Sequence, residues 1–244
     1  MKEWFAQWFD SPHYHQLYGH RDEHEAEAFI SKLIQHLQPA PQSNFLDLAC
    51  GKGRHTRCLA KSADFEVIGL DLSPQSIEEA IKLSKGLPRF SFAVHDMRRL
   101  FRTQYFDAIF CLFTSFGYFK TEHEHALTFQ QIYKGLKSEG YFVLDFLNVL
   151  PVLPTLPQLG SKTVGSTTYK WHKYLENNRI CKNIQFQEHG KDYEFTEQVR
   201  AFTLEELTNM MQLTGFKNVQ VFGNYQLEDF DPDHSPRLIL IAQK

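Results

Sequence analysis

FLDLACGKGRH, residues 45–55, is an apolar run that stops abruptly at two glycines separated by one lysine. A short buried strand that breaks into a glycine turn is the place where nucleotide-like ligands dock in open α/β sheets. The stretch therefore predicts an α/β fold with a ligand site at this turn. Gly51 and Gly53 alone do not identify the ligand.

Strands and helices alternate around this stretch. Besides the quoted strand, we expect strands over 66–71, 90–96 and 106–113 and from Tyr141 onward. Helices are expected over 26–37 and 54–62, from Pro74 after a Ser73 cap, and after the Thr121 and Glu124 capping box. Such alternation implies a mostly parallel sheet with right-handed crossovers.

The alternation breaks at Leu150, where three prolines mark an irregular connection. Three antiparallel strands are expected after it, over 167–175, 179–188 and 193–202. A helix capped by Thr203 and ending near Gly215 follows, with two last strands over 219–225 and 237–243. We therefore predict one domain formed by 1–150 and 203–244, into which residues 151–202 are inserted as an antiparallel β-sheet.

The composition excludes several classes of protein. The chain has 244 residues with 42% hydrophobic content, enough for one large α/β domain with an insertion. Its formal charge of -3 without long runs of like charge argues against a nucleic-acid partner, and no apolar segment is long enough to predict a membrane span. We expect a cytoplasmic protein, either monomer or homodimer, that binds a small molecule and keeps its four cysteines as reduced, packed thiols.

Three acidic residues at strand ends narrow the choice of ligand. The dinucleotide fingerprint G-x-G-x-x-G fails because Thr56 occupies its third glycine position. Asp47 lies inside the first strand, where a buried carboxylate requires a cation or several donors. Asp71 ends the second strand and can accept hydrogen bonds from both ribose hydroxyls, and Asp96 at the end of the third can hold an adenine edge. A ligand with a ribose, an adenine and a positively charged aminoacyl end satisfies all three.

DLACGKGR (47–54), GLD (69–71) and HDM (95–97) together resemble the class I S-adenosylmethionine (SAM) dependent methyltransferases over nearly the whole chain. The resemblance implies a Rossmann-like sheet of seven strands, mostly parallel with the last one antiparallel, and helices on both faces. It also implies that the glycine turn passes under the methionine part of SAM, that Asp71 binds the ribose, and that Asp47 lies near the amino group. The further cofactor residues that it implies are Ala49, Gly51, Gly53, Leu72, Asp96, Met97, Leu112 and Phe113.

A narrower resemblance points to small-molecule methyltransferases. YHQLYGHRD (14–22) and CLFTSFGYFKT (111–121) are similar to the branch with sugar N,N-dimethyltransferases and glycine or sarcosine N-methyltransferases. There an aromatic N-terminal helical arm folds over SAM and the antiparallel insertion covers the acceptor, which implies that Tyr14 and Tyr18 contact the cofactor. The branch admits an amine nitrogen as acceptor, but the residues identify neither the acceptor nor the atom methylated. Candidates for an assisting base are Tyr18, Tyr118 and His123.

Other interpretations remain open. A nicotinamide-dependent oxidoreductase is disfavoured by Thr56, and a SAM-binding protein without catalysis is the non-enzyme alternative. No metal is expected, since the N-terminal histidines have no ligand-like spacing: His13, His15, His20 and His24. The aromatic residues before the first long helix either form static core or close over the ligand; Pro12 and Gly19 favour closure.

Overall fold

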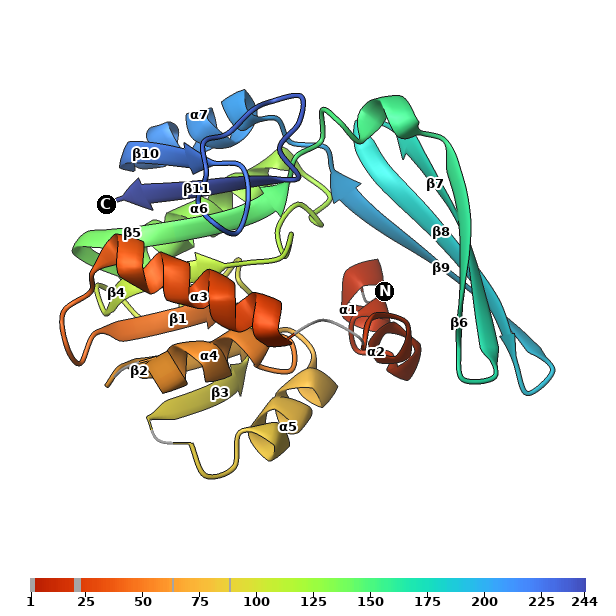
Figure 1. Cartoon of the computed structure of the whole chain (residues 1–244), viewed down its shortest axis with the longest axis horizontal. Helices are drawn as coiled ribbons and strands as arrows, with labels where there is room; N and C mark the ends of the chain where they lie inside the picture. Colours follow the sequence, from red (N-terminus) through yellow and green to blue (C-terminus); the bar gives the residue numbers. More distant parts are fainter. Residues whose placement is uncertain (1–2, 20–22, 63, 88) are drawn as a thin grey trace.

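The computed structural model describes residues 3–19, 23–62, 64–87 and 89–244. In this described part of the chain the main sheet has seven strands in the order β10-β11-β5-β4-β1-β2-β3 (Figure 1). The strands β1 to β5 are parallel, while β11 is antiparallel to both β5 and β10. The bounds are β1 Asn44–Leu48, β2 Glu66–Asp71, β3 Phe90–Val94, β4 Phe106–Cys111, β5 Leu136–Leu147, β10 Lys217–Phe222 and β11 Arg237–Gln243. The predicted fold class is confirmed.

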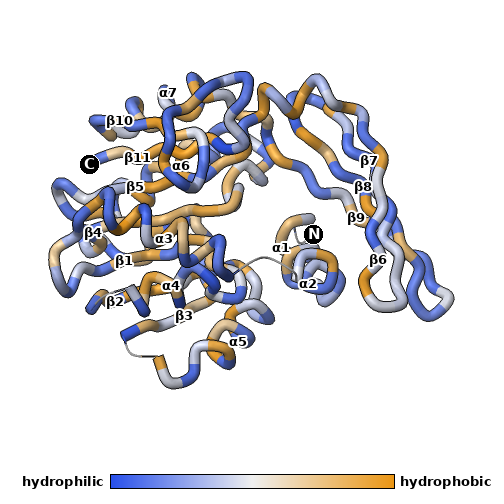
Figure 2. Tube along the Cα trace, viewed as in Figure 1, coloured by the Kyte–Doolittle hydropathy of each residue, from blue (hydrophilic) through white to orange (hydrophobic). Residues whose placement is uncertain are grey.

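Helices cover both faces of this sheet. The long helices are α3 Glu23–Leu37, α4 Arg54–Ser62, α5 Pro74–Leu83, α6 Glu122–Gly135 and α7 Leu204–Thr214. The side chains of α3 and α4 pack into one apolar cluster and those of α6 and α7 into another, on opposite faces. Hydrophobic residues follow the central strands between these layers (Figure 2). The two capping boxes form as predicted, with Thr121 and Thr203 as the N-caps of α6 and α7.

Several predicted strand boundaries shift; the strand expected over 193–202 covers Lys191–Arg200, and β10, expected over 219–225, covers Lys217–Phe222. β3 and β4 end two residues earlier than expected, at Val94 and Cys111, and β5 begins five residues earlier, at Leu136. β4 stops because Phe113 and Thr114 adopt positive φ angles of 62° and 58°, which extended strands do not contain. The residues after β4 therefore form a turn at the carboxyl edge of the sheet.

A second, antiparallel sheet stands apart from the main one (Figure 1). In the described part of the chain it has four strands: β6 Gln158–Val164, β7 Thr167–Glu176, β8 Arg179–Glu188 and β9 Lys191–Arg200. The prediction of three strands was wrong, because it did not include the strand β6. β6 is an edge strand with mostly exposed residues, and its Leu159 is 79% exposed, so it carries no alternating apolar signal.

Two short helices, α1 Trp4–Trp8 and α2 Pro12–Tyr18, lie between the two sheets (Figure 1). They form the N-terminal arm, residues 3–19. Trp8 and Leu17 are 1% and 2% exposed because they pack on the inner face of the second sheet. The sheet residues of this cluster with the deepest burial are Tyr169, Ile184 and Phe186. The arm is therefore packed core on its sheet side. No helix of the described residues is long and apolar enough to cross a membrane.

Candidate active site

A cavity of about 410 Å³ opens at the carboxyl ends of β1, β2 and β4, a size that suits a small-molecule ligand. Its lining comes from loops at the edge of the main sheet and from the arm. The arm lies between the two sheets (Figure 1). Most residues predicted to bind the cofactor line its wall: Tyr14, Tyr18, Ala49, Gly51, Asp71, Leu72, Asp96, Met97, Leu112 and Phe113. The other two, Asp47 and Gly53, lie behind the wall and do not belong to it.

The two glycines of the turn have different structural roles. Gly51 has a φ of 55°, and a Cβ built on it would meet nothing within 4 Å, so its backbone faces open space in the cavity. Gly53 has a φ of 72°, but a Cβ there would come within 2.6 Å of the Phe92 ring. Gly51 therefore lets a ligand approach the backbone, whereas Gly53 lets α4 pack closely on β3.

Asp47 is held from inside the protein. Its side chain is 1% exposed, and the hydroxyl of Thr56 donates a hydrogen bond of 2.6 Å to Asp47 Oδ2. Burial raises the pKa of this carboxyl to about 6, although the hydrogen bond from Thr56 opposes the shift. Thr56, at the position of the third dinucleotide glycine, is thus the partner of this buried acid. The placement of Asp47 beside an amino group remains a prediction.

Asp71, the acid expected to bind the ribose, joins the glycine turn to the loop after β2. Its Oδ2 accepts the backbone N–H of Gly51 at 2.8 Å, and its Oδ1 accepts the N–H of Ser73 at 2.8 Å. Burial raises the pKa of Asp71, and these backbone donors oppose the shift. Each carboxylate oxygen has two acceptor positions, so a ribose diol can still bind beside the backbone donors.

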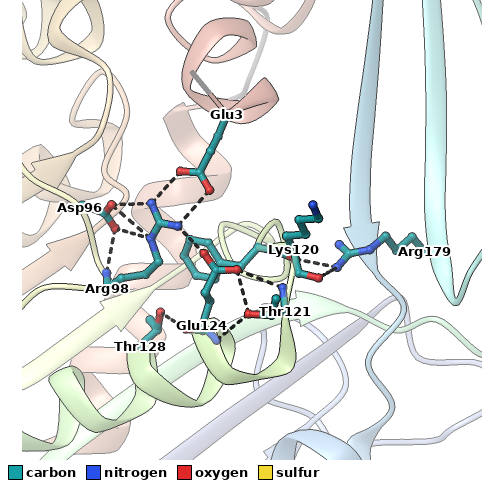
Figure 3. Close-up of polar contacts among 9 residues, drawn as sticks. Glu3, Asp96, Arg98, Lys120, Thr121, Glu124, Thr128 and Arg179 are labelled. Atoms are coloured by element: carbon teal, nitrogen blue, oxygen red, sulfur yellow. Dashed lines mark hydrogen bonds and ion pairs between the residues drawn. The ribbon is translucent and has the colours of Figure 1, made fainter. Parts of the chain in front are cut away.

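Asp96 is bound by Arg98, a residue that the sequence did not single out (Figure 3). The Arg98 guanidinium also reaches Glu3 of the arm and Glu124 of α6, at 2.7 Å and 2.6 Å. Burial alone would raise the pKa of Asp96, but the hydrogen bonds and charge of Arg98 outweigh it and hold the pKa below its ordinary value. The spacing of Asp96 and Arg98, two residues apart, could have indicated an ion pair between them. The contact of Arg98 with the arm could not be predicted, because it depends on tertiary structure.

Aromatic rings form a continuous wall on the arm side of the cavity. Ring centroids of Phe9 and Tyr14, Phe9 and Tyr118, and Tyr14 and Tyr18 lie 4.9, 5.0 and 5.0 Å apart. All four residues line the cavity. Phe9 is one of the aromatic residues before the first long helix that were expected to form core or to close over the ligand, and its place on the wall depends on the packing of α1.

The Tyr18 hydroxyl points toward the second sheet. It donates to Glu197 Oε2 at 3.0 Å and accepts from Lys182 Nζ at 2.6 Å. Trp8 Nε1 donates to the other oxygen of Glu197 at 2.6 Å. The ring of Tyr18 thus faces the cavity while its hydroxyl ties the arm to β8 and β9.

His123, the third candidate base, is exposed in the first turn of α6 and is not part of the cavity wall. Among the N-terminal histidines, His15 lines the cavity, and His20 lies outside the described residues. The described part of the chain holds no group of three or more His, Cys, Asp or Glu placed to bind a metal. All four cysteines are free and buried.

The comparisons with known proteins agree on one activity. Residues 45–140 match the family model described as a methyltransferase domain. The chain is 28% identical over 213 residues to YqeM of Bacillus subtilis (strain 168), a protein named as a methyltransferase, covering 83% of this chain and 85% of that protein. It is 26% identical over 236 residues to the glycine/sarcosine N-methyltransferase of Aphanothece halophytica, covering 92% and 83%.

The fold comparison gives the same arrangement. A SAM-dependent methyltransferase from Clostridium acetobutylicum ATCC 824 superimposes with a TM-score of 0.79 at 20% identity, covering 98% of this chain and 97% of that one. The cavity fits the cofactor: Gly51 leaves the space above the turn open, and Asp71 offers acceptors at the ribose position. Residues 45–140 carry a methyltransferase domain, and the chain is a SAM-dependent methyltransferase. The nicotinamide alternative is set aside.

Proposed function

We propose that the enzyme methylates a nitrogen atom of a small-molecule amine. The observation that carries the proposal is the aromatic wall of Phe9, Tyr14, Tyr18 and Tyr118, which encloses a cavity of small-molecule size. Aromatic rings suit a site that must accommodate positive charge on an ammonium product. Similarity to an N-methyltransferase of glycine and sarcosine over most of both chains supports an amine acceptor.

SAM supplies an electrophilic methyl group, so the protein has to orient the acceptor and exclude water. Ala49 and Gly51 present the backbone of the turn to the cofactor, and Leu72 and Met97 flank the adenine position. The arm closes the cavity from above, with Phe5 and Phe9 on its wall. With the cofactor held by the turn and the acceptor enclosed by the arm, the acceptor lies in line with the transferred methyl group and forms no covalent bond to the protein.

An amine must lose its proton before it reacts. Tyr18 and Tyr118 line the cavity, but the hydroxyl of Tyr118 donates to the backbone carbonyl of Thr114, and that of Tyr18 donates to Glu197. Both phenols are therefore held in place by protein acceptors. We propose that they orient the amine, which arrives in its neutral form, and that catalysis rises with pH as the free amine becomes available.

The test is a screen of acceptors for release of S-adenosylhomocysteine. Primary and secondary amines, amino acids and amino sugars form the test arm, and matched alcohols and phenols form the control arm. Amines should turn over faster than their hydroxyl counterparts, with rates that follow the pKa of each amine. Turnover restricted to alcohols or phenols would contradict the proposal. We also propose that residues 151–202 form an inserted unit and that the enzyme acts in the cytoplasm.

A further inference from the structure

Asp145 is a buried acid outside the cavity that the methyl transfer does not use. It lies in β5, is 1% exposed, and interrupts the apolar run YFVLDF. Its Oδ1 accepts from Arg237 Nε of the neighbouring strand β11 at 2.7 Å, and its Oδ2 accepts from the Tyr225 hydroxyl at 3.2 Å. Burying an isolated carboxylate costs free energy, so the position of Asp145 is explained by the groups that stabilise it and by what it stabilises in return.

The reason lies in the turn after β4. The backbone N–H of Phe113 donates to Asp145 Oδ2 at 2.7 Å, and the N–H of Thr114 donates to the Asp145 carbonyl at 2.9 Å. Arg237 Nη2 adds a bond of 2.9 Å to Thr114 Oγ1. The Asp145 carboxylate thus satisfies the backbone donor of Phe113, the Asp145 main chain satisfies that of Thr114, and Arg237 binds the Thr114 hydroxyl.

This turn is strained. Phe113 and Thr114 are consecutive non-glycine residues with φ angles of 62° and 58°, and Thr114 is β-branched, which makes a positive φ especially unfavourable. Such a conformation persists only where the surroundings determine it. Asp145 and Arg237 supply those surroundings.

The strained turn places Phe113 and the residues that follow Thr114 on the cavity wall. Two guanidinium groups lie near the Phe113 ring: that of Arg54 is 5.1 Å from the ring centroid, and that of Arg237 is 5.9 Å from it. From Thr114 the chain enters the segment 115–119, whose residues all line the cavity. We infer that Asp145 and Arg237 are positioning residues: they hold the Phe113–Thr114 turn and thereby shape the wall against which SAM binds. This inference concerns the cofactor and does not depend on the acceptor.

The test compares two acids of β4 and β5 that each accept a backbone N–H and pair with a cation. Asp145→Asn removes the charge that pairs with Arg237 and leaves a similar side-chain shape. Asp107→Asn is the control, because Asp107 at the opposite end of β4 also accepts a backbone N–H, from Asn44 at 2.7 Å, and pairs with a cation, Lys137. We expect Asp145→Asn to weaken SAM binding, measured by calorimetry, about tenfold or more. Asp107→Asn should lower the melting temperature but leave SAM affinity within about twofold of the wild type.

A second substitution separates positioning from general stability. Thr114→Gly in the Asp145→Asn background should restore most of the SAM affinity, since glycine adopts the positive φ without the ion pair. If Asp145→Asn does not fold, Arg237→Gln, at a side chain less deeply buried, serves in its place with the same rescue. Wild-type affinity in the Asp145 variant, an equal loss in Asp107→Asn, or no rescue by Thr114→Gly would each overturn the inference. None of these readouts needs an amine acceptor, so a failed acceptor screen leaves this test intact.

Discussion

One nitrogen of the Arg98 guanidinium, Nη2, contacts both the arm and the wall of the cofactor cavity. This atom lies 2.7 Å from Glu3 Oε2, at the N-cap of α1, and 2.7 Å from Asp96 Oδ2 on the cavity wall. The arm also meets the loop after β2, where Asp10 accepts a hydrogen bond from the Ser73 hydroxyl at 2.6 Å. The arm therefore contacts the main domain two residues beyond each of the acids Asp71 and Asp96.

Replacing Arg98 by Met should free the start of the arm and leave three carboxylates without their shared cation. We expect the free energy of unfolding to fall by about 2 to 4 kcal/mol, because the guanidinium is largely buried among charged partners. Hydrogen exchange of the α1 peptide should accelerate. Lys82→Met is the control, since its pair with Glu78 is exposed and its loss should leave the midpoint of a urea titration almost unchanged. Unchanged α1 exchange in Arg98→Met would show that the arm is held without this contact.

Asp71→Ala should weaken SAM binding by about 1.5 to 3 kcal/mol for each ribose hydrogen bond lost. The variant also loses the acceptors for Gly51 and Ser73, so a lower melting temperature is expected as well. Calorimetry of SAM binding provides the measurement. Asp64→Ala is the control, because Asp64 forms an exposed pair with Arg89 before the opposite end of β2. Equal affinities in the two variants would remove Asp71 from the ribose site.

Replacing each glycine of the turn by alanine should affect a different property, fold stability at Gly53 and SAM affinity at Gly51. Gly53→Ala places a methyl group against the Phe92 ring and should destabilise the fold by about 2 to 4 kcal/mol. Gly51→Ala meets no neighbouring atom and should cost only about 1 kcal/mol of stability, but its methyl group occupies the cavity and should reduce SAM affinity. Melting curves with and without SAM distinguish the two. A Gly51 variant with normal SAM affinity would contradict the proposed path of the methionine part.

Tyr18→Phe removes the hydroxyl that joins Lys182 to Glu197 and should lower stability by about 1 to 2 kcal/mol. Because the arm then binds the second sheet less firmly, exchange of the arm peptide should rise in the absence of SAM and be suppressed by it. A double-mutant cycle with Glu197→Gln should give a coupling energy of about 0.5 kcal/mol or more. Additive losses would mean that the hydroxyl and the carboxylate act independently.

Acid should destabilise the protein through His125. This ring is fully buried among Phe116, Phe119 and Phe202, and neither nitrogen has a hydrogen-bond partner in the described part of the chain. Burial lowers its pKa to about 4 from an ordinary 6.5, with the nearby Glu122 opposing the shift. The unfolded chain therefore binds a proton first, and stability present above pH 6.5 is lost as the pH falls toward 4, by about 3 kcal/mol.

Urea titrations of the wild type and His125→Phe across this range test the effect. Their difference isolates His125 from Asp47, whose raised pKa contributes with the opposite sign, adding stability as the pH falls. The wild type should lose more stability than the variant on going from pH 7 to pH 4.5. Parallel curves would show that the ring takes up a proton in the folded protein as readily as in the unfolded chain.

The main sheet could be read from the sequence because its signals are local. Apolar runs of strand length, the glycine turn after Leu48 and the capping boxes at Thr121 and Thr203 each involve residues a few positions apart. Acids at the ends of parallel strands meet at one edge in any sheet of this type, so Asp71 and Asp96 could be placed in one site. The exposed edge strand β6 escaped prediction because it has almost no apolar pattern to detect.

Tertiary structure decided what lies against these elements. The arm packs against strands more than 140 residues later in the chain, as in the bond between Gln16 and Val164, and no local pattern encodes that contact. The same holds for Gly53 against Phe92, for Glu3 on Arg98, and for the turn at Phe113 held by Asp145. Periodicity determines which face of an element is apolar, but the partner of that face depends on how distant segments fill the remaining space. The sequence alone therefore determined the main sheet and the edge at which the cavity opens, while long-range packing decided that the arm, rather than the second sheet, covers the cavity.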